Sequence, residues 1–271
     1  MRPKEHIELI KGRAYKYFDY GGDKPVVILL HGMYVTKSNM EDIAQDLSTK
    51  FRCVALDLPG HNKVSLKKIT KFDDLADYVL MFIKKKQFKE VYLVGYSLGG
   101  LISLKIAEKA DNTKMVKGLV VWSAPILGFQ HGLTRVAKLA IPISKIIPEK
   151  VYLAVVTNDI LNKLIASVYS KADLFIKPMK GTLSALSLRD AVKLIDISVN
   201  VSFDFPKSVP TLFVFDKRDP LVSYKNYRHS KEHFESGSLI VATIHKSGHF
   251  RDYEGYSSLR KEIQRFLTEN L

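Results

Sequence analysis

The stretch VYLVGYSLGGL, residues 91–101, decides how this sequence is interpreted. An apolar run, Val91–Val94, is followed at once by Gly95-Tyr96-Ser97-Leu98-Gly99, and a sequence of helical character comes next. Glycine tolerates positive φ and close backbone contact, so the pattern is typical of an ordinary tight turn. A serine between glycines, at the end of a buried strand, is also typical of a nucleophile held on a strained strand-to-helix turn.

Apolar runs and amphipathic stretches alternate on both sides of this turn. Repeated strand–helix units predict an α/β fold, with a mostly parallel sheet covered by helices on both faces. Strands are expected over 7–10, 13–20, 26–30, 53–56, 91–94, 118–122, 211–215 and 239–243, and helices over 39–48, 73–85, 98–110 and 256–267.

Residues 125–209 interrupt the alternation. They contain helical patterns punctuated by prolines, and no convincing sheet strand. One apolar face includes Leu183, Leu186, Val192 and Ile195. The sequence therefore predicts a core formed by 1–124 and 210–271, with 125–209 inserted as a helical cap over the sheet.

Size and composition indicate a globular protein. The chain has 271 residues, of which 46% are hydrophobic and 26% charged. No apolar run approaches the roughly 18 residues that span a bilayer, and the first residues lack the apolar core of a secretory signal. The single cysteine, Cys53, excludes an intramolecular disulfide and is expected in the core. A cytoplasmic location is expected.

The formal net charge is +14, and lysine supplies most of the positive residues. Because the lysines are scattered and no nucleic-acid motif accompanies them, we expect a solvated surface and no nucleic-acid partner. Lys138, Lys145, Lys150 and Lys163 lie near apolar faces of the predicted cap. Those faces either pack onto the sheet or give a weak contact with an anionic membrane surface.

Five short motifs occur in a characteristic order: HGM at 31–33, DLPGH at 57–61, GYSLGG at 95–100, DKRDPLV at 216–222 and SGHF at 247–250. Together they resemble the α/β-hydrolase fold family, and the GYSLGG motif is similar to those of small capped serine hydrolases such as carboxylesterases and monoacylglycerol lipases. The resemblance covers both ends of the expected sheet and leaves out the insertion. It implies the α/β-hydrolase fold, with a mostly parallel central sheet, flanking helices and a helical cap.

The resemblance also implies a catalytic triad in the chain order Ser97, Asp219, His249. A serine hydroxyl is a weak nucleophile and needs a general base, for which His249 is the candidate and His245 the nearest rival. Asp219 would orient the imidazole and stabilise the imidazolium, with Asp216 as the competitor. Some relatives carry this acid one strand earlier, where the present chain has Ser123.

Two backbone N–H groups are expected to form the oxyanion hole. One is that of Leu98, at the first turn of the helix, and the other is that of Met33, by resemblance to H-G-x loops. The chain departs from its relatives at Asn62, where many have glycine, and at Asp216, where glycine is frequent. Asparagine tolerates left-handed backbone geometry better than most residues, so the turn at Asn62 is expected to survive. Asp57, His31 and His61 are interpreted as structural.

The sequence thus predicts a serine esterase that cleaves carboxylic esters or thioesters with an apolar acyl group, through an acyl-enzyme on Ser97. No organic cofactor or metal is implied, because the sequence has no dinucleotide fingerprint and no ligand cluster of recognisable spacing. Two alternatives stay open. One is an acyltransferase, perhydrolase or carbon–carbon bond hydrolase using the same triad, and the other is a non-catalytic ligand-binding protein of the same fold.

Overall fold

The structure of the chain, a computed structural model, describes residues 3–126, 146, 148, 150–151, 186–199, 201–204, 208–216, 219, 222, 228, 239–244 and 255–271. Most of the predicted cap, and His249, lie outside these residues.

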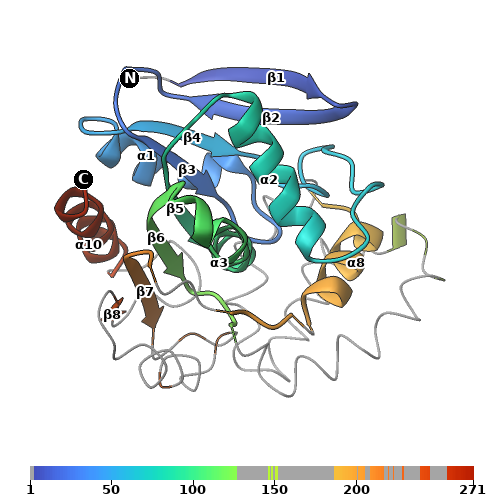
Figure 1. Cartoon of the computed structure of the whole chain (residues 1–271). Coiled ribbons are helices and arrows are strands. Elements are labelled where there is room, and N and C mark those ends of the chain that lie inside the picture. The colour runs from blue at the N-terminus through green and yellow to red at the C-terminus, as the bar shows by residue number, and fades with distance from the viewer. Residues whose placement is uncertain are drawn as a thin grey trace.

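The strands form one 8-stranded sheet in the order β1-β2-β4-β3-β5-β6-β7-β8 (Figure 1). β1 and β2 are antiparallel, β2 also runs antiparallel to β4, and the strands from β4 to β8 are mutually parallel. This confirms the predicted mostly parallel sheet. The strands are β1 (Lys4–Ile10), β2 (Arg13–Asp19), β3 (Val26–Leu30), β4 (Arg52–Leu56), β5 (Val91–Tyr96), β6 (Val116–Trp122), β7 (Thr211–Asp216) and β8 (Leu239–Ile244).

Helices cover both faces of this sheet (Figure 1). The side chains of α2 and α3 belong to one buried apolar cluster, and those of α1 and α10 belong to the cluster on the opposite face. The central strands are therefore buried on both sides, which explains their continuous apolar sequences. The described helices are η1 (Lys37–Met40), α1 (Glu41–Leu47), α2 (Asp73–Lys85), α3 (Leu98–Ala110), η2 (Asp111–Thr113), α8 (Leu188–Ser198) and α10 (Tyr256–Glu269).

Several element boundaries differ from the sequence prediction. The helix expected over 39–48 begins with the 3-10 turn η1 at Lys37 and continues as α1 only to Leu47. The strand expected from Gly118 starts at Val116, because Val116 pairs with Val91 of β5. Both differences arise from pairing and packing between distant segments, to which local patterns are insensitive.

The described part of the predicted cap packs against the core. Ser187 caps the start of α8 by accepting a hydrogen bond from the Asp190 N–H at 3.1 Å. Leu186 and Leu194 are buried, and both lie close to Gly60 in the loop after β4. The aromatic ring of Phe203 lies 6.1 Å from that of Phe72 in an edge contact. Residues 186–199 and 201–204 therefore pack on the side of the sheet that α2 and α3 cover.

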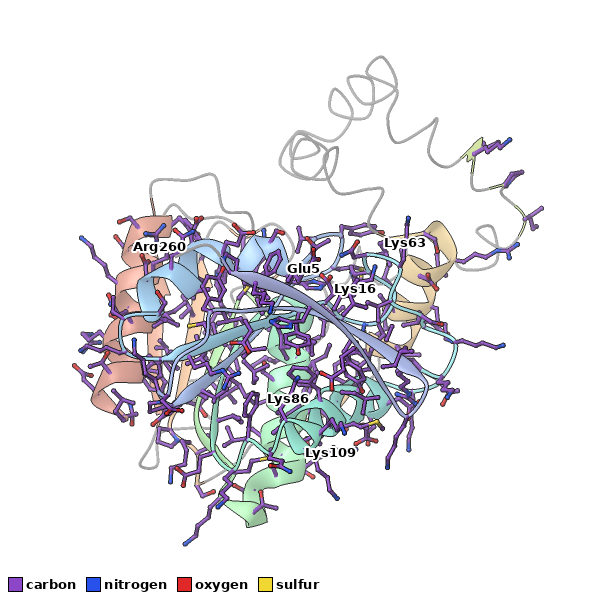
Figure 2. The ribbon with its side chains drawn as sticks, turned by 90° about the horizontal axis from the view of Figure 1, so that it is seen from above. Glu5, Lys16, Lys63, Lys86, Lys109 and Arg260 are labelled. Carbon is purple, nitrogen blue, oxygen red and sulfur yellow. The ribbon has the colours of Figure 1, made fainter. Side chains whose placement is uncertain are left out.

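Charged side chains are spread over many elements, as the labelled residues in Figure 2 show for β1, β2, α3, α10, the loop after β4 and the residue that follows α2. Several form ion pairs between elements, including Lys86 with Glu8 at 2.6 Å and Arg52 with Asp19 at 2.6 Å. Among the described residues, no helix combines the length and apolarity that crossing a membrane requires.

Candidate active site

Ser97 is the single residue between β5 and α3. Its backbone has φ 52° and ψ −113°, a conformation that side-chain-bearing residues rarely adopt and that costs on the order of 1–3 kcal/mol. Its N–H donates to the Trp122 carbonyl at 2.8 Å, which ties the turn to the end of β6. The hydroxyl does not cap α3. Ser97 therefore lies on a strained strand-to-helix turn and not on an ordinary, unstrained tight turn.

Close backbone contacts explain the glycines around Ser97. A Cβ atom on Gly99 would lie 2.6 Å from the His31 carbonyl oxygen and closer still to that of Leu30. A Cβ atom on Gly95 would lie 2.5 Å from the Ser103 hydroxyl oxygen. Both distances are shorter than real Cβ contacts. The glycines thus let the first turn of α3 lie directly against the end of β3.

The same contacts place the loop after β3 beside Ser97. A Cβ atom on Gly32 would lie 3.2 Å from the Ser97 Cβ and 2.7 Å from the Tyr96 ring. Met33, the predicted oxyanion donor, follows Gly32 and is partly buried against the core. Leu98 begins α3, where backbone N–H groups have no partner within the helix. The segments that carry both predicted donors are therefore neighbours of the candidate nucleophile.

His31 fixes the peptide group between Gly32 and Met33. Its Nε2 accepts a hydrogen bond from the Leu58 N–H at 3.0 Å, so its Nδ1 carries the proton and donates to the Gly32 carbonyl at 2.7 Å. In a trans peptide the C=O and the next N–H point in opposite directions. The Met33 N–H therefore points away from His31. Complete burial lowers the pKa of His31, against the opposing effect of Asp57, so the ring stays neutral.

His61 supports the next residue of this loop. Its Nε2 accepts a hydrogen bond from the Tyr34 N–H at 3.3 Å, and its ring makes an edge contact with that of His31 at 4.8 Å. Burial, and then the neighbouring His31, hold the pKa of His61 well below its ordinary value. Two neutral imidazoles thus position the loop 31–34. This geometry agrees with the structural roles expected for both histidines.

A buried ion pair holds the far end of the loop. Asp57 accepts hydrogen bonds from the Lys37 N–H and ammonium, both at 2.8 Å, and from the Asn62 side-chain amide at 2.8 Å. Burial alone would lower the pKa of Lys37, but Asp57 and then Glu5 raise it overall. Sequence reasoning missed Lys37, because its only signal is a lysine just before a helix, and exposed lysines are common there.

Asn62 forms the turn at the position where the family resemblance led us to expect glycine. Its φ is 46°, in the left-handed region that asparagine tolerates. Its side chain also donates to Asp57, a hydrogen bond that glycine lacks. The expectation that this turn survives the substitution agrees with the structure.

Asp219 follows β7 and is buried. Its Oδ1 accepts a hydrogen bond from the Val222 N–H at 2.9 Å, and its own N–H donates to the Asp216 carbonyl at 3.1 Å. Asp216, its competitor, is the last residue of β7 and is also buried. Asp219 therefore sits in a local turn that directly follows the carboxyl end of β7.

The topology brings the ends of β5, β7 and β8 to one edge of the sheet. β7 and β8 pair in parallel up to Asp216 and Ile244, and the parallel ladder continues through β6 to β5. Ser97 and Asp219 thus come from loops at the carboxyl edge, where ligands bind in open α/β sheets. His249 and its rival His245 follow β8 in the sequence and lie outside the described residues, so the complete triad stays a prediction.

No group of three or more histidine, cysteine, aspartate or glutamate side chains that could hold a metal ion occurs within the described ranges. The chemistry of the described site residues is that of a hydroxyl, a carboxylate and backbone N–H donors.

Three comparisons place the chain among known proteins. The family model described as the alpha/beta hydrolase fold matches residues 25–140. An sn-1-specific diacylglycerol lipase, ABHD11, of Xenopus tropicalis is 24% identical over 260 residues, which are 90% of this chain and 78% of that protein. The crystal structure of naproxen esterase from Bacillus subtilis superposes with a TM-score of 0.68 at 16% identity, over 98% of this chain and 92% of that one.

A further relative is similar over a shorter range. A protein of Haemophilus influenzae, provisionally named 2-succinyl-6-hydroxy-2,4-cyclohexadiene-1-carboxylate synthase, is 41% identical over 86 residues. That match spans 31% of this chain and only 34% of the relative. The superposition with solved structures shows the α/β-hydrolase fold, and the match to the family model agrees with it.

Proposed function

We propose that this chain, which has the α/β-hydrolase fold, is a serine hydrolase cleaving carboxylic esters or thioesters with an apolar acyl group. One observation carries the proposal: the strained conformation of Ser97 at the junction of β5 and α3, beside the loop of Gly32 and Met33. A turn of this kind presents the Oγ atom at the carboxyl edge of the sheet.

In the proposed mechanism, the Ser97 Oγ attacks the carbonyl carbon of the ester while His249 accepts the hydroxyl proton. The negative charge that develops on the carbonyl oxygen is stabilised by the Met33 and Leu98 N–H groups, each contributing about 3 kcal/mol. His249 returns the proton to the leaving alcohol, which leaves an acyl group on Ser97. Water, activated by the same imidazole, then releases the acid, and Asp219 orients the imidazole throughout.

Two features of the structure support this assignment of roles. The first is the hydrogen bond from His31 to the Gly32 carbonyl, which directs the Met33 N–H away from His31. The second is the burial of Asp219 at the same sheet edge as Ser97. The family relatives named as a lipase and an esterase agree with ester substrates.

The test combines covalent labelling with turnover. We expect a fluorophosphonate to label the wild-type chain, and p-nitrophenyl esters of increasing acyl length to be hydrolysed, with both signals lost in Ser97→Ala. Ser103→Ala is the matched control, because Ser103 is a buried serine on α3 whose hydroxyl has no hydrogen-bond partner among the described residues. A folded wild-type chain that neither takes the label nor turns over any ester would favour a non-catalytic role.

Acyl transfer is the second candidate, favoured by one comparison. The acetyltransferase component of an acetoin cleaving system of Pseudomonas putida is 32% identical over 101 residues, which are 36% of this chain and 27% of that protein. Adding a short alcohol to the ester assay separates the two functions. Hydrolysis yields the free acid at an unchanged rate, whereas transfer yields the new ester in increasing proportion with alcohol concentration.

A further inference from the structure

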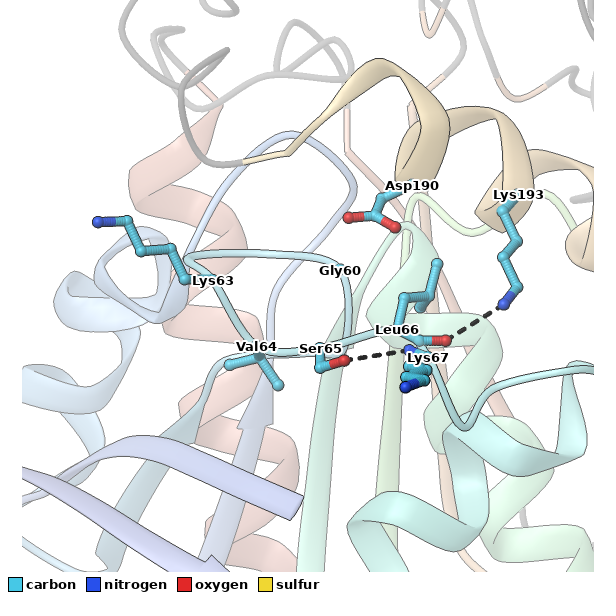
Figure 3. A pocket seen from close by; sticks show the side chains of 8 residues that line it. All are labelled: Gly60, Lys63, Val64, Ser65, Leu66, Lys67, Asp190 and Lys193. Carbon is cyan, nitrogen blue, oxygen red and sulfur yellow. Dashed lines mark hydrogen bonds between the residues drawn. The ribbon is translucent and has the colours of Figure 1, made fainter. Parts of the chain in front are cut away.

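A cleft of about 360 Å³ lies between the loop after β4 and the helix α8 (Figure 3). Residues 60 and 63–67 form one wall, and Asp190 and Lys193 of α8 form the other. The volume is within the range of small-molecule sites, which begins at roughly 300 Å³. The lining is charged rather than apolar, so the cleft is suited to an ionic ligand.

Lysine dominates the charge of this cleft. Lys63, Lys67 and Lys193 line it, against the single carboxylate of Asp190. The half-buried Lys193 ammonium donates a hydrogen bond to the Leu66 carbonyl at 3.2 Å, which holds it at the wall and leaves its other N–H groups for a ligand. The Lys63 ammonium points away from the other labelled side chains in Figure 3. Lys67 and Lys193 are therefore the principal cations.

The Lys67 ammonium makes no hydrogen bond or ion pair within the described part of the chain. Its backbone N–H donates to the Ser65 hydroxyl at 3.2 Å, whereas its exposed ammonium forms no ion pair with any described residue. A variant at Lys67 therefore tests the charge of the cleft without removing a contact that shapes the loop.

The loop that forms this wall also contacts the candidate active site. Gly60 has φ 90° and lies against Leu186 and Leu194. The next residue, His61, accepts the Tyr34 N–H one position after the proposed oxyanion donor Met33. A ligand in the cleft would therefore rest on a loop that is hydrogen-bonded to the loop beside Ser97.

We propose that this cleft binds a phosphate group, either on a free small molecule or in a lipid headgroup. Ammonium groups form strong charge-assisted hydrogen bonds to phosphate oxygens. Lys67 and Lys193 belong to opposite walls of the cleft, and salt screens their attraction for an anion only weakly at distances below the Debye length of about 10 Å at 0.1 M salt. The Asp190 carboxylate would repel the anion and weaken its binding. Removing this negative charge should therefore strengthen binding. The proposal does not depend on the hydrolase activity.

Titration calorimetry of the full chain with inorganic pyrophosphate tests the site directly. We expect Lys67→Gln to weaken binding about threefold, as for an exposed charge pair, and Asp190→Asn to strengthen it by a similar factor. Lys193→Arg should retain binding, whereas Lys193→Gln should weaken it. Lys50→Gln is the matched control, because it removes one exposed lysine that does not line the cleft. Thermal melts confirm that each variant is folded.

Vesicles distinguish the source of the phosphate. Sedimentation of the chain with phosphatidic acid vesicles, but not with pure phosphatidylcholine vesicles, and release by pyrophosphate indicate a lipid headgroup. Pyrophosphate binding without vesicle binding indicates a free phosphate compound. The proposal is wrong if neither probe binds, or if Lys50→Gln weakens binding as much as Lys67→Gln, because the net charge of +14 would then explain the attraction.

Discussion

At the scale of single residues, the site is built on backbone conformations that side chains resist. Ser97 has φ 52°, and Asn62 has φ 46°. At Asn62 the side chain compensates by donating to Asp57. At Ser97 the glycines on either side permit the close contacts, and the strain is held by the surrounding β5, β6 and α3. A residue that is strained and retained is typical of a functional site.

This strain predicts different effects of two inactive variants on the free energy of unfolding. Ser97→Ala keeps the Cβ atom and therefore the strain, so its free energy of unfolding should stay near that of wild type. Ser97→Gly removes the Cβ atom, and glycine adopts positive φ readily, so the free energy of unfolding should exceed that of Ser97→Ala by about 1 kcal/mol. Urea unfolding of the two variants measures the difference. A Gly variant less stable than the Ala variant would contradict the assignment of strain.

At the scale of elements, two loops at the carboxyl edge of the sheet and the helix α8 depend on one another. The loop after β3 is held to the loop after β4 by three contacts: His31 with the Leu58 N–H, His61 with the Tyr34 N–H, and the Lys37–Asp57 pair. The loop after β4 in turn lies against α8. Removing either Lys37 or Asp57 would leave the other charge buried and uncompensated. We therefore expect such a change to disorder both loops and not only one of them.

The two buried imidazoles predict that stability decreases in mild acid. Burial lowers the pKa of both His31 and His61, whereas in the unfolded chain each returns to about 6.5. Between the folded and unfolded values the unfolded chain binds more protons. The free energy of unfolding is therefore fully retained above about pH 6.5 and falls as the pH is lowered below it.

Urea unfolding at several pH values between about 5 and 7.5 checks this dependence. His61→Gln keeps an acceptor for the Tyr34 N–H but does not titrate, so its stability should fall less steeply over the same interval. His6→Gln is the control for a histidine that is only half-buried. Equal slopes in wild type and His61→Gln would show that the buried imidazole is not the source.

At the scale of the whole molecule, the sheet separates two apolar clusters, and Cys53 lies in the one shared with α1 and α10. Its side chain has no solvent exposure, and burial raises the pKa of its thiol to about 12. The thiolate is the reactive form. Cys53 is therefore unreactive while the sheet is folded, and its rate of thiol labelling measures how often this part of the sheet unfolds.

This arrangement predicts the kinetics of thiol labelling. A disulfide reagent such as DTNB should label the native chain slowly at about pH 8, and completely within the mixing time in concentrated urea. At intermediate urea the labelling rate should follow the unfolded fraction measured by circular dichroism. Fast labelling of a chain with native circular dichroism would mean that this side of the sheet opens locally.

Local patterns were sufficient for much of the fold. The helices over 73–85 and 98–110 and the parallel order of strand–helix units follow from periodicity, because burying one face of a helix, or both faces of a strand, requires a definite spacing of apolar residues. The turn at Ser97 follows from its glycines. The family resemblance added the chain order of the candidate site residues, of which His249 awaits a structural test.

The sequence by itself determined which residues are available for the chemistry, and the tertiary structure decided how they are held. The Lys37–Asp57–Asn62 network, the tautomer of His31 and the approach of Gly32 to Ser97 each join segments far apart along the chain. Periodicity and motifs report on neighbours in sequence, whereas hydrogen bonds and close contacts depend on which strands pair. Only the order of the strands in the sheet brings those loops together.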